Sequence, residues 1–291
     1  MAMAQAESKL LVTGAGGMLG KALVACLESR DHKVVAMPKE KLDVTNYEQV
    51  QSVLKEQKPS LVLHCAAYTK VDQAESEPAL AFLINGYGTE NLAVVCNQLD
   101  IPMLYISSDY VFDGTQNRPY TTWDQTSPLS VYGKTKLAGE LAVQRHLKRF
   151  YIVRTSWLYG PNGQNFVETI LRLAQEATKP LRVVSDQTGS PTCTLSLSEV
   201  IADLIETERY GVYHATDDGI TNWCEFAREI TKELGTEVTA IETKDMPRPA
   251  TRPKYSVLDK TTLINTIGRE LPSWQESLAN YLSLKKSEAL V

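Results

Sequence analysis

Cysteine and histidine are scarce in this sequence of 291 residues, which contains five of the first and four of the second. The cysteines form no Cys-x-x-C pair, and no histidine stands near them at metal-site spacing; they are Cys26, Cys65, Cys96, Cys193 and Cys224. An odd and dispersed set of this kind argues against a disulfide framework and against a zinc site. It predicts reduced thiols in a cytoplasmic protein, with no bound metal.

Long hydrophobic runs and an excess of positive charge are also missing. No stretch approaches the roughly 18 apolar residues of a membrane span, and residues 1–8 lack the basic and apolar regions of a signal peptide. Lysine and arginine number 30 against 35 aspartates and glutamates, a net charge of -5. That balance argues against a nucleic-acid surface. We therefore expect neither a membrane nor a nucleic-acid partner.

What the sequence does contain is a glycine-rich turn between a strand-like and a helical segment. Residues 9–13 are apolar, residues 21–29 have a helical pattern, and Gly14-Ala15-Gly16-Gly17-Met18-Leu19-Gly20 lies between them. Glycines in this context allow close approach of the backbone to a pyrophosphate, which the amides at the helix start attract. We predict a dinucleotide site formed by Gly14, Gly16, Gly17, Met18, Leu19 and Gly20.

The second expected strand, residues 32–37, ends in Pro38-Lys39-Glu40-Lys41 and lacks the carboxylate that would bind a ribose 2′-hydroxyl. Lys39 or Lys41 could meet a 2′-phosphate instead, or both could be solvated surface charges. NADPH is therefore the predicted cofactor, with NADH as an alternative. Asp43 could bond an adenine amino group or cap the next helix. We assign Lys39, Asp43 and Val44 to the cofactor site.

A third expected strand, residues 60–64, leads into a run of small residues. Small side chains at the carboxyl end of a strand let a cofactor lie against the backbone, although they also suit tight helix packing. On the first interpretation the cofactor site includes Cys65, Ala66, Ala67 and Tyr68. Asn85, a polar residue among apolar neighbours, could support an active-site helix or cap a turn.

A complete set of groups for proton transfer follows. Residues 103–106 read as a buried strand, so Ser108 falls at its carboxyl end. Tyr132 and Lys136 are four residues apart in a helical segment, which places both on one face. We expect the lysine charge to lower the pKa of the phenol, and the serine to hold a carbonyl oxygen that the tyrosine protonates. An exposed helix face with no chemistry is the alternative for a Tyr-x-x-x-Lys pair alone.

The remaining segments continue the alternation of strands and helices. Strands are expected at 151–155, 182–184 and 212–215, and helices at 165–177, 197–208, 223–234 and 274–284. Trp157 could stack on a substrate ring or belong to the core. The basic, proline-rich loop 246–256 suits a diphosphate, with solvated charge as its alternative.

This order of elements predicts an α/β fold: a Rossmann-like doubly wound parallel sheet with a smaller, interwoven C-terminal substrate-binding domain. Residues 1–156 would form mainly the dinucleotide-binding domain. Residues 157–291 would form mainly the substrate-binding domain, with some segments returning to the sheet.

Taken together, the glycine turn, Ser108, Tyr132 and Lys136 resemble the extended short-chain dehydrogenase/reductase superfamily. Within it, the sequence resembles the dTDP-4-dehydrorhamnose reductase family across residues 12 to about 280. The likeness is carried by residues 66–75, 107–114, 131–140, 154–157 and 186–192, and by Arg252, Pro253 and Ser256. Ser108 stands where the family more often has threonine, a change that keeps the hydroxyl.

The resemblance implies an NADPH-dependent reduction of the C4 ketone of dTDP-4-dehydro-L-rhamnose to dTDP-L-rhamnose. It makes Ser108, Tyr132 and Lys136 catalytic, with Tyr132 and Lys136 also touching the cofactor. It places five residues around the dTDP-sugar: Val71, Asp109, Tyr110, Trp157 and Arg252. Some members dimerise through magnesium held by acidic residues at positions that are Ala22 and Leu195 here. Neither residue binds magnesium, so we expect no metal and a monomer.

Two other functions stay open. One is reduction of a different nucleotide-linked 4-keto-6-deoxy sugar. The other is a non-catalytic NADP-binding regulatory subunit resembling that of methionine adenosyltransferase. A dehydratase of the same superfamily is disfavoured, because Asp109 is followed by Tyr110 where those enzymes have a second acid.

Overall fold

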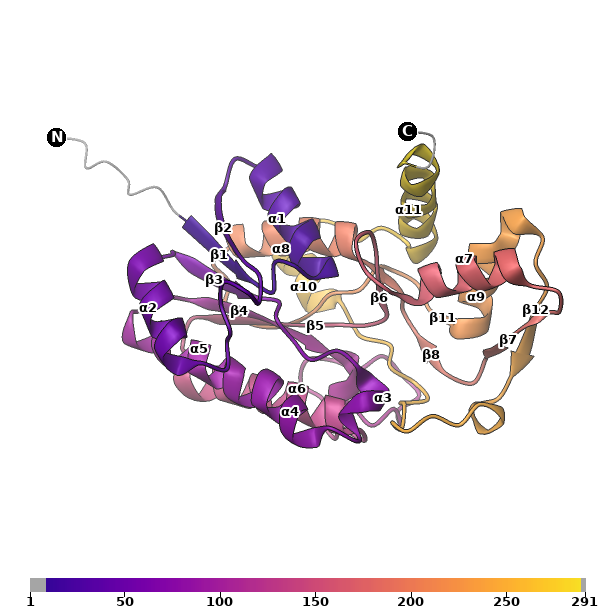
Figure 1. Ribbon diagram of the computed structural model, residues 1–291, viewed down its shortest axis with the longest axis horizontal. Coiled ribbons are helices and arrows are strands. Elements are labelled where there is room, and N and C mark those ends of the chain that lie inside the picture. Colours follow the sequence, from indigo (N-terminus) through magenta and orange to yellow (C-terminus); the bar gives the residue numbers. More distant parts are fainter. Residues whose placement is uncertain (1–8, 289–291) are drawn as a thin grey trace.

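The computed structural model describes residues 9–288 (Figure 1); the expectation about a signal peptide concerns residues 1–8, which lie outside this range. The strands are β1 (Lys9–Thr13), β2 (Lys33–Met37), β3 (Leu61–His64), β4 (Met103–Ser108), β5 (Phe150–Thr155), β6 (Leu158–Tyr159), β7 (Leu181–Val184), β8 (Thr188–Gly189), β9 (Thr192–Cys193), β10 (Gly211–His214), β11 (Thr221–Asn222) and β12 (Val238–Ile241). The helices are α1 (Met18–Ser29), α2 (Tyr47–Gln57), α3 (Val71–Ala74), α4 (Pro78–Phe82), α5 (Gly88–Gln98), α6 (Val131–His146), α7 (Phe166–Glu176), α8 (Thr194–Glu206), α9 (Trp223–Thr231), α10 (Thr261–Ile267) and α11 (Trp274–Glu288).

Six parallel strands form the central sheet, in the order β10-β5-β4-β3-β1-β2. From β1 the chain moves first to one side, to β2, and then to the other, to β3 and onward. The strand order therefore reverses between β1 and β3, and the crevice outside their carboxyl ends is where open α/β sheets bind ligands. This topology confirms the predicted doubly wound α/β fold.

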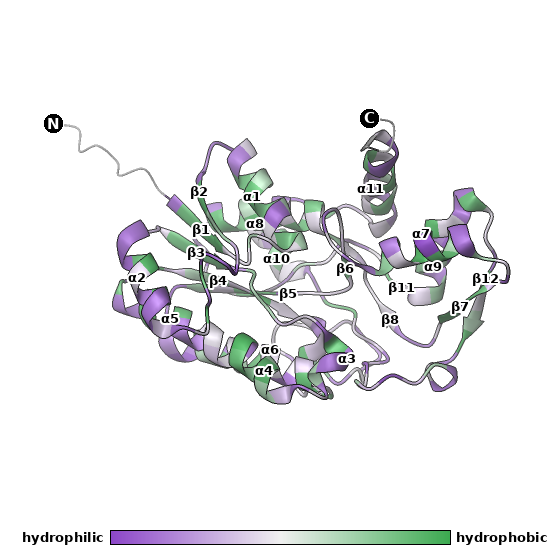
Figure 2. Ribbon diagram, viewed as in Figure 1, coloured by the Kyte–Doolittle hydropathy of each residue, from purple (hydrophilic) through white to green (hydrophobic). Residues whose placement is uncertain are grey.

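Helices cover both faces of the sheet (Figure 1). On one face α1, α8 and α10 enclose a core that includes Leu23, Leu63 and Ile201. On the other, α2, α5 and α6 enclose a second core that includes Val50, Leu92 and Ile152. Hydrophobic residues run through the strands and alternate with hydrophilic ones along the helices (Figure 2), as expected for helices packed on one side.

A smaller unit lies beyond the carboxyl end of the sheet and has its own apolar cluster, drawn from α7, α9, α11 and the parallel pair β7–β12. The C-terminal half of the chain does not stay in this unit, because β10 pairs with β5 in the main sheet. Helices α8 and α10 also pack on the main sheet. The boundary between residues 156 and 157 stays a prediction.

One expectation about membranes needs correction. The continuous helical segment Pro78–Gln98 is 21 residues long with a mean hydropathy of 1.2, so it passes the length and composition test for a membrane span. Half of it is buried inside the protein, because its middle and C-terminal part packs on α2 and α6. A core helix passes the same test, so the segment is weak evidence for a membrane contact.

Candidate active site

The glycine turn after β1 lies directly against the segment that follows β3. Gly14 has φ +65°, and a Cβ there would be 2.5 Å from the amide nitrogen of Ala66. A Cβ on Gly20 would be 2.2 Å from the Gly14 carbonyl oxygen. These two glycines are required by packing, since no larger residue fits without backbone movement. The predicted close approach of the turn and the small residues after β3 is thus present.

The same turn leaves the start of α1 open for an anion. Gly17 is the N-cap and supplies no side-chain hydrogen bond, so the first-turn amides of α1 have no protein partner from the cap. Gly16 and Gly17 are exposed, Met18 is half-buried, and the Leu19 side chain lies in the core. Leu19 can therefore offer only its backbone amide. Exposed amides at a helix start suit a diphosphate.

The loop after β2 carries the predicted adenosine-side residues. Lys39 and Lys41 are exposed. Asp43 Oδ1 accepts hydrogen bonds from the Thr45 amide at 3.0 Å and the Thr45 hydroxyl at 2.8 Å, which lower the pKa of the Asp43 carboxyl. Asp43 is thus a local turn-forming residue, and the N-cap of α2 is Asn46. Val44 is buried beneath this loop.

Asn85 ties the cofactor edge to the helix that carries Tyr132 and Lys136. It sits in a π-helical turn, Leu83–Tyr87, between α4 and α5. Its Oδ1 accepts from the Tyr68 amide at 2.7 Å, and its Nδ2 donates to the Tyr68 carbonyl at 3.1 Å and to Thr135 Oγ1 at 2.9 Å. Of the two interpretations of Asn85, the structure favours support of the active-site helix. Such π-bulges occur frequently at functional sites.

Ser108, Tyr132 and Lys136 meet at the carboxyl end of β4. Ser108 is the last residue of β4, and Tyr132 and Lys136 lie one turn apart near the start of α6. Ser130 caps α6 by accepting from the Gly133 amide at 3.1 Å. A Cβ on Gly133 would be 2.2 Å from the Tyr110 carbonyl oxygen. The start of α6 is therefore fixed closely against the turn that follows Ser108.

The electrostatics of this set differ from the sequence-based expectation in one respect. Burial raises the pKa of Tyr132 to about 12, with a further increase from the Asp109 charge and a decrease from the Ser108 hydroxyl. Burial lowers the pKa of Lys136 to about 7, although Glu140 opposes that shift. The prediction that lysine lowers the tyrosine pKa was wrong for the protein alone, because desolvation of both groups dominates.

The Lys136 ammonium group has an aromatic partner that the sequence did not indicate. Lys136 is 2% exposed, and its Nζ lies 4.2 Å from the centroid of the Tyr105 ring. This cation–π contact stabilises the charged form inside the protein. Cys65 lies close enough to influence Lys136 as well, and the pKa of its thiol is raised to about 12, chiefly by burial. Cys65 is thus an unreactive residue that lines the site.

On the substrate side, Arg252 and Asp72 join two predicted segments. Arg252 donates to both Asp72 oxygens at 3.0 Å, and the Ala250 amide donates to Asp72 Oδ1 at 3.2 Å. Asp72 belongs to the short helix α3, which begins at Val71. The basic loop 246–256 is thereby anchored beside the catalytic set, where the Tyr110 ring packs edge-on against Tyr132 at 5.5 Å.

Another aromatic side chain covers one face of the Trp157 ring. It has φ +48°, an unusual backbone conformation for a bulky residue, and its ring stacks on Trp223 with centroids 3.6 Å apart. Phe166 packs against Trp223 in turn, at 4.5 Å. A Cβ on Gly189 would be 2.7 Å from the Trp157 ring. One face of Trp157 is therefore unavailable to a ligand.

Some residues of the site were missed by sequence reasoning. Trp223 stands at the start of a helix with no other catalytic-looking residue and meets Trp157 only in the fold. Glu75 accepts from the Val131 amide at 2.8 Å and so stabilises the start of α6. A carboxylate near a helix N-terminus stabilises it, but the two residues are 56 positions apart, and this contact cannot be recognised in the sequence.

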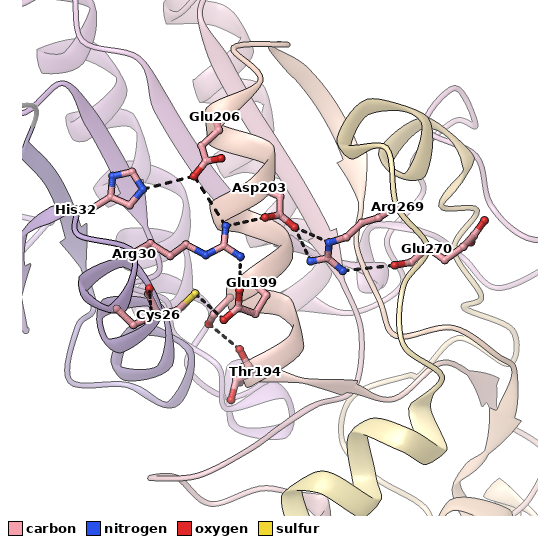
Figure 3. A network of polar contacts seen from close by, with 11 residues as sticks. Cys26, Arg30, His32, Thr194, Glu199, Asp203, Glu206, Arg269 and Glu270 are labelled. Atoms are coloured by element: carbon pink, nitrogen blue, oxygen red, sulfur yellow. Dashed lines mark hydrogen bonds and ion pairs between the residues drawn. The ribbon is translucent and has the colours of Figure 1, made fainter.

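A second polar cluster lies where the end of α1 meets α8 and the segment after α10 (Figure 3). Arg30 and Arg269 bind Asp203, and Arg30 also binds Glu199. A hollow of about 560 Å³ opens beside these side chains. Its charges are already paired with one another. Within residues 9–288 no group of three or more histidine, cysteine or acidic side chains is arranged to hold a metal ion.

The fold and this site define the class of protein: a dinucleotide-dependent oxidoreductase of the extended short-chain dehydrogenase/reductase type. The family model described as "RmlD substrate binding domain" matches residues 8–286, and the chain belongs to that family. A dTDP-4-dehydrorhamnose reductase of Streptomyces griseus is 44% identical over 260 residues, 86% of this chain and 85% of the relative.

Two further comparisons agree with this assignment. A dTDP-4-keto-6-deoxy-D-glucose reductase of Streptomyces niveus is 41% identical, over 85% of this chain and 87% of the relative. A crystal structure of the Bacillus anthracis dTDP-4-dehydrorhamnose reductase in complex with NADP has a TM-score of 0.90 and 40% identity. It covers 95% of this chain and 99% of its own. The predicted family and the Rossmann-like fold are confirmed.

Proposed function

We propose that this protein reduces the C4 ketone of dTDP-4-dehydro-L-rhamnose to give dTDP-L-rhamnose, with NADPH as the reductant. The observation that carries the proposal is that Ser108, Tyr132 and Lys136 gather at the carboxyl end of β4, on the same edge of the sheet as the glycine turn after β1. The names of the relatives at 44% identity and of the structural neighbour with NADP support it.

The residues around the crevice fit a dinucleotide. Gly16 and Gly17 are exposed and leave room for a diphosphate against the first-turn amides of α1, whereas Gly14 lets the turn approach Ala66 closely. The segment Cys65 to Tyr68 lies beside this turn and would border the nicotinamide half. Lys39 would meet the 2′-phosphate, since no carboxylate stands directly at the end of β2. Of the two acids in the loop, Glu40 is exposed and Asp43 is bound to Thr45. When bound, NADPH supplies the hydride for the ketone carbon.

Three side chains of the protein would carry out the proton transfer to the ketone oxygen. Ser108 Oγ would hydrogen-bond the ketone oxygen, and Tyr132 would give its phenolic proton to the same oxygen as negative charge develops there. With a pKa near 12, Tyr132 is still a stronger acid than an ordinary alcohol, so the transfer is downhill. The ammonium group of Lys136, buried one helical turn away, would stabilise the phenolate that remains.

The dTDP-sugar would lie between α3, the loop after β4 and the basic loop. Arg252 would bind the diphosphate, as a planar guanidinium does well, and would exchange part of its contact with Asp72 for the phosphate. Val71, Asp109 and Tyr110 would border the sugar, with Trp157 at the far wall. We propose further that the protein acts in the cytoplasm, which its five free, dispersed cysteines suit. We also propose that it is a monomer, because Ala22 and Leu195 stand where some relatives have the acids that bind magnesium.

A second candidate is reduction of dTDP-4-keto-6-deoxy-D-glucose or a similar 4-keto sugar. The 41% identical Streptomyces niveus reductase favours it, because that enzyme's name specifies this substrate. The shape of the sugar pocket would decide between these two diastereomers. A non-catalytic regulatory role is disfavoured by the intact set of Ser108, Tyr132 and Lys136.

The test is NADPH oxidation, followed by near-ultraviolet absorbance, with dTDP-4-dehydro-6-deoxyglucose as the starting sugar. The assay is run with and without a separate 3,5-epimerase. Oxidation that requires the epimerase supports the rhamnose assignment. Oxidation without it supports the second candidate, and no oxidation in either case would overturn both in favour of a regulatory role.

A further inference from the structure

Ser108 has only one proton to donate, and a neighbouring acid competes for it. Ser108 Oγ lies 2.9 Å from Asp109 Oδ1 and accepts a hydrogen bond from the Tyr110 amide at 3.2 Å. A hydroxyl offers one donor and two acceptor sites. If Asp109 is ionised it can only accept, so the Ser108 proton must point at Asp109. No proton of Ser108 then remains for a substrate oxygen.

Burial of Asp109 shifts its ionisation toward the neutral form. The residue is 1% exposed, and its Oδ2 is buried with no hydrogen-bond partner among the residues that the structure describes. Burial raises the pKa of this carboxyl to about 6, although the hydroxyls of Ser256 and Ser108 and the backbone amides of Asp109 and Tyr110 oppose the shift. Substrate that covers the site would remove more water and raise the pKa further.

The groups that face Asp109 do not supply a compensating positive charge. Tyr132 of α6 and Tyr110 of its own turn are phenols whose pKa values are raised, mainly by burial, so both are neutral. Ser256 approaches from the basic loop and is uncharged. The Arg252–Asp72 ion pair acts on the far side, at Tyr110, and its opposite charges largely cancel. The other cation of the catalytic set is Lys136 on α6.

We propose that Asp109 is a positioning residue that works in its protonated form: it donates to Ser108 Oγ and so directs the Ser108 proton to the substrate ketone. This inference rests on the proposed reduction and adds a condition to it. The proton count is unchanged through the step, because Asp109 and Ser108 only share their protons while Tyr132 transfers one. Ionisation of Asp109 would reverse the hydrogen bond and leave the ketone without the Ser108 donor.

The experiment compares the pH dependence of kcat in the wild type and in Asp109→Asn, whose amide can donate to Ser108 at any pH. In the wild type, kcat should fall about tenfold per pH unit above the pKa of Asp109 in the substrate complex. Asp109→Asn should lack this descending limb, and Asp109→Ala, with no donor, should have a lower kcat at every pH. Any limb that belongs to Lys136 would remain in both variants.

Asp113→Asn is the matched control, because Asp113 lies in the same loop but bonds Thr115 and Tyr120. Its pH profile should be that of the wild type. A descending limb that persists unchanged in Asp109→Asn would overturn the proposal.

Infrared difference spectra of the wild type with pH give a second readout that needs no turnover. A carboxylic-acid carbonyl band that titrates, and is missing from Asp109→Asn, is expected. If no such band exists at a pH where the enzyme is active, Asp109 is ionised and the proposal fails. If instead the wild type reduces no 4-keto sugar, the proposed function fails, and the band still reports whether Asp109 keeps its proton.

Discussion

Glu140 of α6 and Arg154 of β5 form a two-pronged ion pair inside the protein, with Nε to Oε1 at 2.9 Å and Nη2 to Oε2 at 2.7 Å. They are 1% and 4% exposed. Ser107 also donates to Glu140, and the Arg154 guanidinium lies 5.1 Å from the Phe112 ring centroid. Glu140 follows Lys136 by one turn of α6, so this pair holds the helix face that carries Tyr132 and Lys136 against the sheet.

Replacing Glu140 by Gln should cost about 3–5 kcal/mol of unfolding free energy, because it leaves the Arg154 charge buried without its partner. Urea unfolding measures this change. Glu225→Gln is the control: Glu225 pairs with Arg228 at 2.6 Å, but both side chains are about half exposed, and exposed pairs contribute about 1 kcal/mol or less. Equal losses of unfolding free energy in the two variants would show that the buried Glu140–Arg154 pair contributes no more than an exposed pair.

Gly20 and Gly16 should respond differently to alanine. In Gly20→Ala the new Cβ would meet the Gly14 carbonyl oxygen at 2.2 Å, whereas in Gly16→Ala the nearest atom is Pro38 Cβ at 3.5 Å. We expect Gly20→Ala to lose about 1–3 kcal/mol of stability. Gly16→Ala should keep its stability and bind NADPH about tenfold more weakly, about 1.4 kcal/mol.

Thermal unfolding without ligand and fluorescence titration with NADPH separate the two effects. Tight NADPH binding by Gly16→Ala would remove Gly16 from the proposed diphosphate site. A stable Gly20→Ala would mean that the turn opens without cost.

The main sheet and its ligand edge could be predicted because their signals are local. Residues 9–13 were predicted as a strand and form β1, and the glycine turn, Ser108 and the Tyr132–Lys136 spacing all lie at strand ends or on one helix face. Of the pair β7–β12, only β7 was predicted. Val238 and Ile241 at the ends of β12 are buried, but the two residues between them are exposed, a pattern too short to distinguish from a loop.

The rest depended on contacts between distant residues. Trp157 meets Trp223, Arg252 meets Asp72 across 180 positions, and neither pairing leaves a periodic trace in the sequence. The pKa of Tyr132 was mispredicted for a related reason. The spacing to Lys136 is visible in the sequence, but the desolvation that dominates both groups is a property of the packed site.

Tyr132→Phe should lower kcat by about 10²-fold to 10⁴-fold, which is the usual contribution of a general acid. The phenylalanine ring can still pack edge-on against Tyr110, so NADPH binding and stability should stay close to those of the wild type. Steady-state NADPH oxidation with a fluorescence titration in parallel checks both. Wild-type turnover in this variant would rule out Tyr132 as the proton donor.

EDTA should not change the mass of the protein in solution. The positions where some relatives hold magnesium are Ala22, which is buried, and Leu195, which packs beside the cluster of α7, α9 and α11. The acids of α8 nearest to Arg30 are engaged by arginines (Figure 3). Light scattering should give a monomer with and without the chelator. A dimer that EDTA dissociates would contradict the prediction.

Acid should destabilise the protein partly through His64. This histidine lies between Thr13 Oγ1 at 2.7 Å and Thr89 Oγ1 at 3.1 Å. Burial, with help from the Lys136 charge, lowers its pKa to about 3, whereas an unfolded histidine titrates near 6.5. Between about pH 6.5 and 3 the unfolded chain therefore binds the extra proton, so the stabilising contribution, complete above about pH 6.5, is lost as pH falls.

Unfolding free energies in urea at several pH values test this. Removing one such histidine should reduce the acid-induced loss of unfolding free energy by about 1.4 kcal/mol per pH unit. The unfolding free energy of His64→Gln should therefore change less steeply with pH than that of the wild type. Asp109 and Asp217, whose pKa values burial raises to about 6, act in the opposite direction between about pH 4 and 6. They are present in both proteins, so the difference in slope isolates His64. An identical slope in the wild type and in His64→Gln would show that His64 is protonated in the folded protein.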